Sequence, residues 1–89
     1  MPDVVIAGAV RTPIGAFNAG LSSLPAHALG EIAIREALSR AKVEAGEVSE
    51  VVLGQILTAG AGQNPARQAA INAGIPQEKT AYGINQLCG

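Results

Sequence analysis

Short apolar runs alternate with helix-forming stretches along this chain, and this order constrains its fold more than any other feature. Val4–Ala7 and Val51–Leu57 are rich in β-branched residues, which predicts strands that are buried on both faces. Ala26–Lys42 and Ala66–Ala73 have helical patterns, and Thr80–Asn85 is a weaker candidate for a third strand. The resulting order of strand, helix, strand, helix and strand (βαβαβ) predicts an α/β fold with a largely parallel sheet.

The longer predicted helix has one apolar face and one charged face. The apolar face consists of Leu29, Ala33, Ile34, Ala37, Leu38 and Ala41. Glu31 and Arg35 are four residues apart, as are Glu36 and Arg40, and in both pairs the acid is N-terminal. This is the better orientation for an ion pair along a helix, and each pair is worth about 0.2–0.5 kcal/mol. We therefore expect the charged face to lie in solvent.

The shorter helix has clear signals at both ends. Asn64 is a plausible N-cap, and Pro65 suits the first helical position. Gly74 suits the left-handed residue that follows a helix, and Pro76 prevents continuation. We expect a little over two helical turns between these signals.

The apolar residues are almost all aliphatic. Hydrophobic residues make up 48% of the 89 residues and aromatic residues only 2%, so Phe17 and Tyr82 alone can add rings to the core. A core rich in alanine suits helices layered closely on a sheet in a large α/β protein, and it stabilises a free-standing miniature domain poorly. We therefore expect residues 1–89 to be part of a larger fold.

Charge and cysteine content exclude several classes of function. The net charge is −1 without a long run of one sign, which argues against nucleic acid and anionic membrane partners. A single cysteine cannot form an internal disulfide or a cysteine-rich metal site. The first residues do not resemble a secretory or mitochondrial leader, and the apolar stretch Val4–Val10 is too short to span a bilayer. We expect a cytoplasmic protein.

Cys88 is the main candidate for chemistry. It follows the third predicted strand and precedes Gly89, and α/β enzymes commonly place nucleophiles where a strand ends. Nearby backbone N–H groups can stabilise an oxyanion at such a position. The alternative for a lone cysteine is a buried structural residue, because free cysteine is among the most buried residue types.

Other polar positions have simpler interpretations. Gly60-Ala61-Gly62 could form a phosphate-binding loop, but Pro65 occupies the place of the third glycine of a dinucleotide fingerprint, which favours a tight turn instead. His27 is expected at the start of the first helix without a catalytic role. Arg67 is either a solvated or locally paired helix residue, or it pairs with a carboxylate at a subunit contact.

Four segments of the chain resemble the thiolase family. Asn85–Gly89 is similar to the segment around the acyl-accepting cysteine of thiolases, and Arg11–Phe17 to the loop after their first strand. Val51–Gln55 and Gly62–Ala69 resemble two further segments, in the same order and at the same spacing. The similarity spans essentially all 89 residues, and Asn64–Gln68 is most like the short-chain biosynthetic branch.

The resemblance implies an acetyl-CoA C-acetyltransferase. Such an enzyme condenses two acetyl-CoA molecules to acetoacetyl-CoA, or catalyses the reverse thiolysis, through an acyl-cysteine intermediate that would form on Cys88. The Cys88 N–H would also contribute to an oxyanion hole, and Gln63 and Asn85 could support the active-site loops. No cofactor or metal is implied, because coenzyme A thioesters are the substrates.

The resemblance also implies that the chain is incomplete. Residues 1–89 correspond to the first part of the N-terminal domain, so that the rest of this domain and the C-terminal domain are expected beyond Gly89. The activating histidine and the second cysteine of the family lie in that remainder, and His27 matches no catalytic position. We therefore expect the 89-residue chain alone to be inactive. The family forms dimers or tetramers, which predicts that Thr80–Gln86 lies near a subunit interface.

Two alternatives remain open from the sequence. A degradative 3-ketoacyl-CoA thiolase with a broader range of chain lengths would share these motifs, since loops outside the sequence set chain-length selectivity. A protein of another class, namely a non-catalytic fragment or interaction module, would keep the motifs without turnover. A second cysteine and a histidine near the substrate distinguish an enzyme from such a module.

Overall fold

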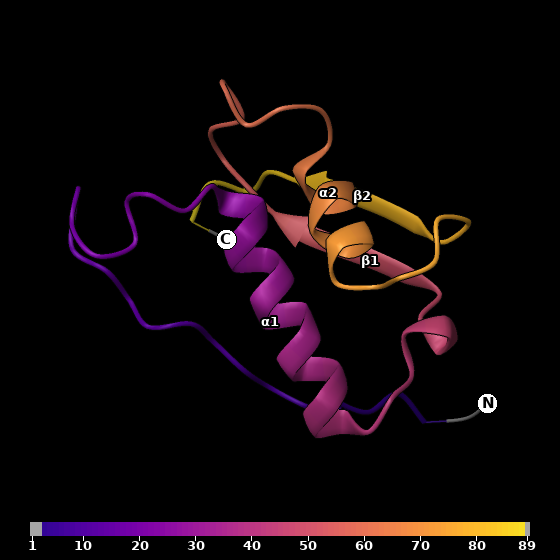
Figure 1. The fold of residues 1–89 in the computed structure, drawn as a ribbon. Helices are drawn as coiled ribbons and strands as arrows, with labels where there is room; N and C mark the ends of the chain where they lie inside the picture. The colour runs from indigo at the N-terminus through magenta and orange to yellow at the C-terminus, as the bar shows by residue number, and fades with distance from the viewer. Residues whose placement is uncertain (1–2, 89) are drawn as a thin grey trace.

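A computed structural model describes residues 3–88 of the chain. Their helices and strands follow the order α1 (Ala26–Ala41), a short 3₁₀ turn η1 (Ala45–Glu47), β1 (Glu50–Gly54), α2 (Pro65–Asn72) and β2 (Thr80–Ile84). β1 and β2 form a parallel pair, and α2 connects them while packing on their face (Figure 1). α1 packs against α2, so both helices cover the same side of the sheet. The α/β class and the parallel pairing are as predicted.

The core lies between the two strands and the two helices. Its buried centre consists of Val51, Ala70 and Ile75, and its half-buried border of Ile34, Leu38, Ala45, Val48, Leu53 and Ala81. α2 contributes three alanines that are almost completely buried, Ala66, Ala69 and Ala70. A Cβ atom placed on Gly30 of α1 would lie only 3.2 Å from the Cβ of Ala69. Small residues therefore allow the two helices to approach closely.

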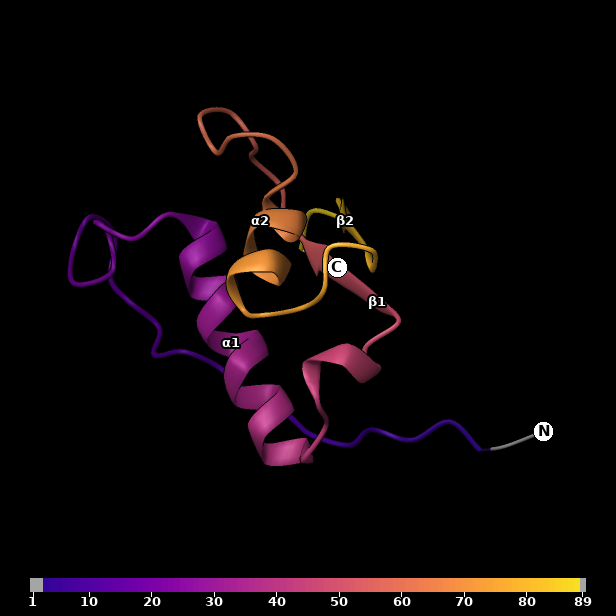
Figure 2. The same cartoon turned by 45° about the vertical axis from the view of Figure 1, so that its right-hand side comes forward.

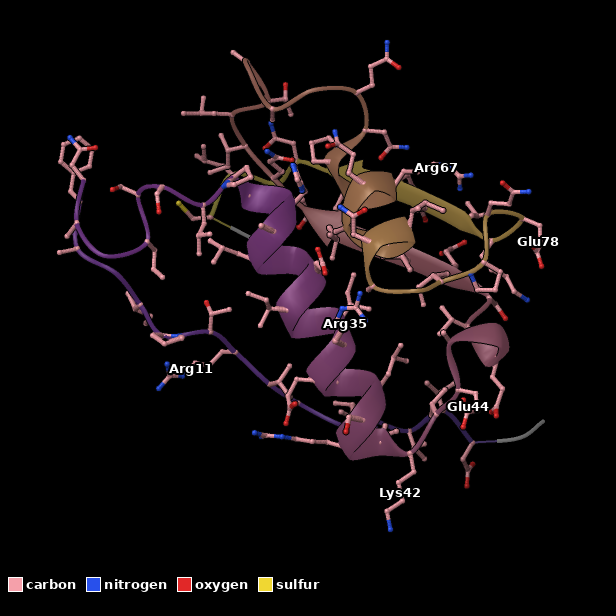
Figure 3. The ribbon with its side chains drawn as sticks, in the orientation of Figure 1. Arg11, Arg35, Lys42, Glu44, Arg67 and Glu78 are labelled. Carbon is pink, nitrogen blue, oxygen red and sulfur yellow. The ribbon has the colours of Figure 1, made fainter. Side chains whose placement is uncertain are left out.

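The charged face of α1 is as predicted from the sequence. Arg35 pairs with Glu31 at 3.2 Å, and Arg40 pairs with Glu36 at 2.7 Å. Arg35 also donates a hydrogen bond to the carbonyl oxygen of Asn72, and Figure 3 shows it on the side of α1 that faces α2. The ion pairs thus stabilise α1, and Arg35 links it to the end of α2.

The predicted ends of α2 are confirmed. The Asn64 side chain accepts a hydrogen bond from the Arg67 N–H at 3.1 Å, and Pro65 is the first helical residue. Gly74 follows the helix with φ of 95°, a conformation that glycine adopts without steric cost. Asn64 also donates to the carbonyl oxygen of Ala81 at 3.0 Å, so this cap connects α2 to β2.

The predicted first strand at Val4–Ala7 is wrong for the described residues. This segment is extended but forms no ladder, and Val4 and Ile6 are 99% and 92% exposed. Figures 1 and 2 show it passing the C-terminal end of α1, where Gly8 lies close to Ala41, away from both strands. A strand needs a neighbour that pairs with its N–H and C=O groups, and β1 and β2 pair only with each other here.

Three further expectations, about the burial of β1, its length and the position of Phe17, are also wrong. Within residues 3–88, β1 is covered on one face only, and Val52 on its other face is 41% exposed. β1 also ends at Gly54 rather than Leu57, where the chain turns away and Leu57 becomes 83% exposed. Phe17 does not contribute to the core but lies exposed in the loop before α1. The helices of residues 3–88 include none that is long and apolar enough to cross a membrane.

Candidate active site

Cys88 lies just beyond the carboxyl end of β2 and exposes a free thiol to solvent. In open α/β sheets, ligands bind outside the carboxyl ends of the strands. Cys88 therefore lies where a reactive side chain of this fold class can meet a ligand.

A tight turn presents Cys88 at this position. The Asn85 side-chain oxygen accepts a hydrogen bond from the Leu87 N–H at 2.9 Å, which closes an Asx turn. Leu87 has φ of 55°, in the left-handed region. This conformation costs a residue with a side chain about 1–2 kcal/mol relative to the right-handed one. Leucine itself gives no signal for this conformation, although an asparagine two positions before Leu87 is a recognisable signal for such a turn.

The turn is also connected to the end of β1. Beyond the paired strands, the Gln55 N–H donates to the carbonyl oxygen of Ile84 at 2.9 Å. One residue further, the Asn85 side-chain NH₂ donates to the carbonyl oxygen of Ile56 at 3.4 Å, a longer and weaker contact. The hydrogen bonding between the two chain segments thus continues past the sheet as far as the turn that carries Cys88.

An open hollow of about 860 Å³ lies beside the thiol. Its walls are the segments that follow the two strands, and they are largely apolar. The lining residues are Gly54, Gln55, Ile56, Leu57, Ile84, Gln86, Leu87 and Cys88. A hollow of this kind can receive the acyl end of a small molecule next to the sulfur.

The glycine-rich loop before α2 is a tight turn, as the sequence favoured. Gly60 and Gly62 have φ of 75° and 82°. The Gln68 side-chain amide donates to the carbonyl oxygens of Ala61 and Gln63, at 3.2 and 2.8 Å. A Cβ atom on Gly62 would lie 2.8 Å from the Gln68 Nε2. The glycine therefore allows the backbone to pass closely around Gln68.

The remaining candidates lie apart from Cys88. Arg67 donates to the carbonyl oxygens of Lys79 and Gln77, at 3.2 and 2.8 Å, so the local pairing is correct (Figure 3). His27 is half-buried in the first turn of α1 and does not line the hollow beside Cys88. Within residues 3–88, no group of three side chains could bind a metal ion. Arg11 is exposed, and within the described residues its side chain donates one hydrogen bond, to the carbonyl oxygen of the neighbouring Thr12.

Tyr82 forms a polar contact across the uncovered face of the sheet. Its hydroxyl donates to Glu50 Oε1 at 3.2 Å. The negative charge of Glu50, followed by this hydrogen bond and by a loss of solvation, raises the pKa of Tyr82 above its ordinary value. The neutral phenol therefore connects β2 to the start of β1. Tyr82 is 42% exposed, so it does not add its ring to the core as the sequence predicted.

Fold and site together define an α/β protein with an exposed cysteine at the carboxyl end of a parallel strand. Residues 4–89 match the sequence model of the thiolase N-terminal domain. The chain therefore belongs to the thiolase family, which confirms the resemblance in the sequence.

Named relatives and a solved structure agree with this assignment. The chain is 64% identical over 88 residues to an acetyl-CoA acetyltransferase of Rhizobium meliloti (strain 1021). The aligned residues make up 99% of this chain and 22% of that relative. It is 55% identical over 86 residues to the cytosolic acetyl-CoA acetyltransferase of Rattus norvegicus, covering 97% of the chain and 22% of the relative.

The solved structure is that of the Acat5 thiolase from Ascaris suum in complex with coenzyme A. It superimposes with a TM-score of 0.91 at 41% identity, over 93% of this chain and 22% of that one. The chain thus spans about 22% of the length of the relatives that it matches.

Proposed function

We propose that the protein containing this chain is an acetyl-CoA C-acetyltransferase, which condenses two acetyl-CoA molecules to acetoacetyl-CoA or cleaves acetoacetyl-CoA with coenzyme A. The observation that carries this proposal is the 64% identity to an acetyl-CoA acetyltransferase over 99% of the chain. The coenzyme A complex of the Ascaris suum thiolase supports an acyl-CoA substrate. Coenzyme A thioesters are then the substrates, and no further cofactor is needed.

In this proposal, Cys88 is the nucleophile. Its thiolate attacks the carbonyl carbon of acetyl-CoA, a carbon–sulfur bond to Cys88 forms, and the coenzyme A thiolate leaves and takes up a proton. A second acetyl-CoA then loses a proton from its α-carbon. The resulting carbanion attacks the acetyl group on Cys88, a carbon–carbon bond forms, and the Cys88 thiolate is released. The exposed thiol and the adjacent hollow support the first step because they leave room for a thioester.

The remaining groups of the reaction belong to other parts of the protein. Residues 1–89 would form the first part of an N-terminal domain. A histidine that activates Cys88 and a second cysteine that removes the α-proton would come from outside this sequence. The backbone N–H of Cys88 would contribute to binding the oxyanion. The 89-residue chain alone would then be inactive, because these groups act jointly.

The proposal extends to assembly and location. β2 and the following residues, Thr80–Gln86, would lie near the interface of a homodimer or tetramer, which would also cover a strand edge that is otherwise open to aggregation. The name of the rat relative supports a cytoplasmic location.

Steady-state assays of the whole gene product test the activity. We expect it to cleave acetoacetyl-CoA with coenzyme A. It should prefer this substrate over 3-ketoacyl-CoA thioesters whose acyl chain is about twice as long or longer. Cys88→Ala should lower kcat by at least about a thousandfold. Equal kcat/KM for the long substrates would instead identify a degradative thiolase, and no turnover of either would leave a non-catalytic module.

A further inference from the structure

The side chain of Asn85 contacts the backbone on both sides of the candidate site. Its oxygen accepts the Leu87 N–H at 2.9 Å, within the turn that carries Cys88. Its NH₂ group donates to the Ile56 carbonyl at 3.4 Å, on the segment that follows β1. Ile56 and Leu87 both line the hollow beside Cys88. One amide therefore connects two walls of the hollow next to the sulfur.

The conformation of Leu87 shows why such a contact is needed. A leucine with φ of 55° is in a region that favours glycine. Leu87 is 70% exposed among residues 3–88, so packing within this part of the chain does not hold it there. The Asn85 hydrogen bond is the contact that fixes the Leu87 N–H. Without it, the turn can relax to right-handed conformations of Leu87, and the direction of the next residue, Cys88, changes.

We propose that Asn85 is a positioning residue that holds Leu87 in the left-handed conformation and thereby directs the Cys88 thiol toward the acyl carbon. This inference rests on the proposed function, because it assigns Asn85 a role in forming the acyl-enzyme. Asn85 acts through Leu87 and does not contact the substrate. Acyl transfer depends on the approach of the sulfur to the carbonyl carbon, and a misplacement of about 1 Å can lower a rate about a hundredfold.

The test measures single-turnover acetylation of Cys88 by acetyl-CoA in the whole gene product, with the acetylated protein quantified by intact mass. Asn85→Ala should lower the acetylation rate by about tenfold to a hundredfold. The acetylation rate of Asn85→Ser should lie between those of wild-type protein and Asn85→Ala. A serine hydroxyl can accept a hydrogen bond from the Leu87 N–H, though a weaker one. Alkylation of Cys88 by iodoacetamide should change by less than about threefold, since this small reagent does not need the thioester geometry.

A second substitution separates positioning from general damage. Glycine adopts positive φ without the cost that leucine has, so Leu87→Gly in the Asn85→Ala background should restore at least about half of the lost rate on a logarithmic scale. Asn72→Ala is the matched control, because it removes an exposed asparagine side chain at the end of α2 and should leave the rate unchanged.

The outcomes distinguish this inference from the proposed function. If wild-type protein acetylates at Cys88 and Asn85→Ala does so at the same rate, the positioning role is wrong. It is also wrong if Leu87→Gly gives no recovery, or if alkylation falls as much as acetylation, because Asn85 would then only maintain the fold. If wild-type protein is not acetylated at Cys88, the proposed function itself fails and this inference fails with it.

Discussion

The unit formed by β1, α2 and β2 and the segment before α1 both contain apolar runs rich in β-branched residues, but only the first forms a layered structure. In the β1–α2–β2 unit, two strands pair with each other and alanines of α2 cover one face. In residues 3–16, Val4 and Ile6 remain exposed, and the segment pairs with no strand. The difference teaches that an apolar run becomes a strand only where a neighbour supplies hydrogen bonds and a covering layer.

The largest expected difference between the two regions concerns added volume. Ala69 is completely buried against α1, so Ala69→Leu should lower the free energy of unfolding by about 1–3 kcal/mol. Ala7→Leu adds the same atoms to the exposed segment and should change it by less than about 0.5 kcal/mol. Urea unfolding of the 89-residue chain measures both. Equal effects would show that Ala7 is packed as tightly as Ala69.

A smaller difference is expected for two asparagines with positive φ. Asn64, with φ of 42°, caps α2 and bonds to β2, whereas Asn18, with φ of 53°, lies in the loop before α1. Asn64→Ala should cost about 1 kcal/mol for the lost cap in addition to the backbone cost that both substitutions share. The difference between the two variants in urea unfolding isolates the cap, and its absence would mean that the Asn64 hydrogen bonds do not stabilise α2.

The smallest effect concerns pH, and it also belongs to the paired strands. The pKa of Tyr82 is raised in the folded chain, chiefly by the charge of Glu50, so folding favours the protonated phenol. Its contribution to stability is fully present below the ordinary pKa of 10.0 and is lost as the pH rises through the higher folded-state value. The wild-type chain should therefore lose urea resistance above about pH 10 more steeply than Tyr82→Phe. Parallel profiles of the two proteins would contradict the contact.

Local signals predicted the elements that depend on local interactions. Asn64, Pro65 and Gly74 marked the ends of α2 correctly because capping involves residues only a few positions apart. The pairs Glu31–Arg35 and Glu36–Arg40 form for the same reason. The strand predicted at Val4–Ala7 is wrong because strand formation depends on pairing with residues that are distant in the sequence, which local signals do not show.

The candidate site shows the same limit. The sequence predicted that Cys88 follows the end of a strand, because the residues of β2 come directly before the motif that contains it. The left-handed Leu87 was not predicted, since leucine has no preference for that conformation and the cause is a hydrogen bond to Asn85. The hollow beside Cys88 also could not be predicted, because its second wall comes from Ile56 and Leu57, which leave the sheet earlier than expected.

The most direct test of the account is the intact mass of the whole gene product before and after incubation with acetyl-CoA. The account predicts a gain of one acetyl group per chain in the wild-type protein, located on Cys88 and absent from Cys88→Ala. A gain of the same mass in Cys88→Ala, or no gain in wild-type protein that is folded and binds coenzyme A, would contradict the assignment of Cys88 as the acyl-accepting nucleophile.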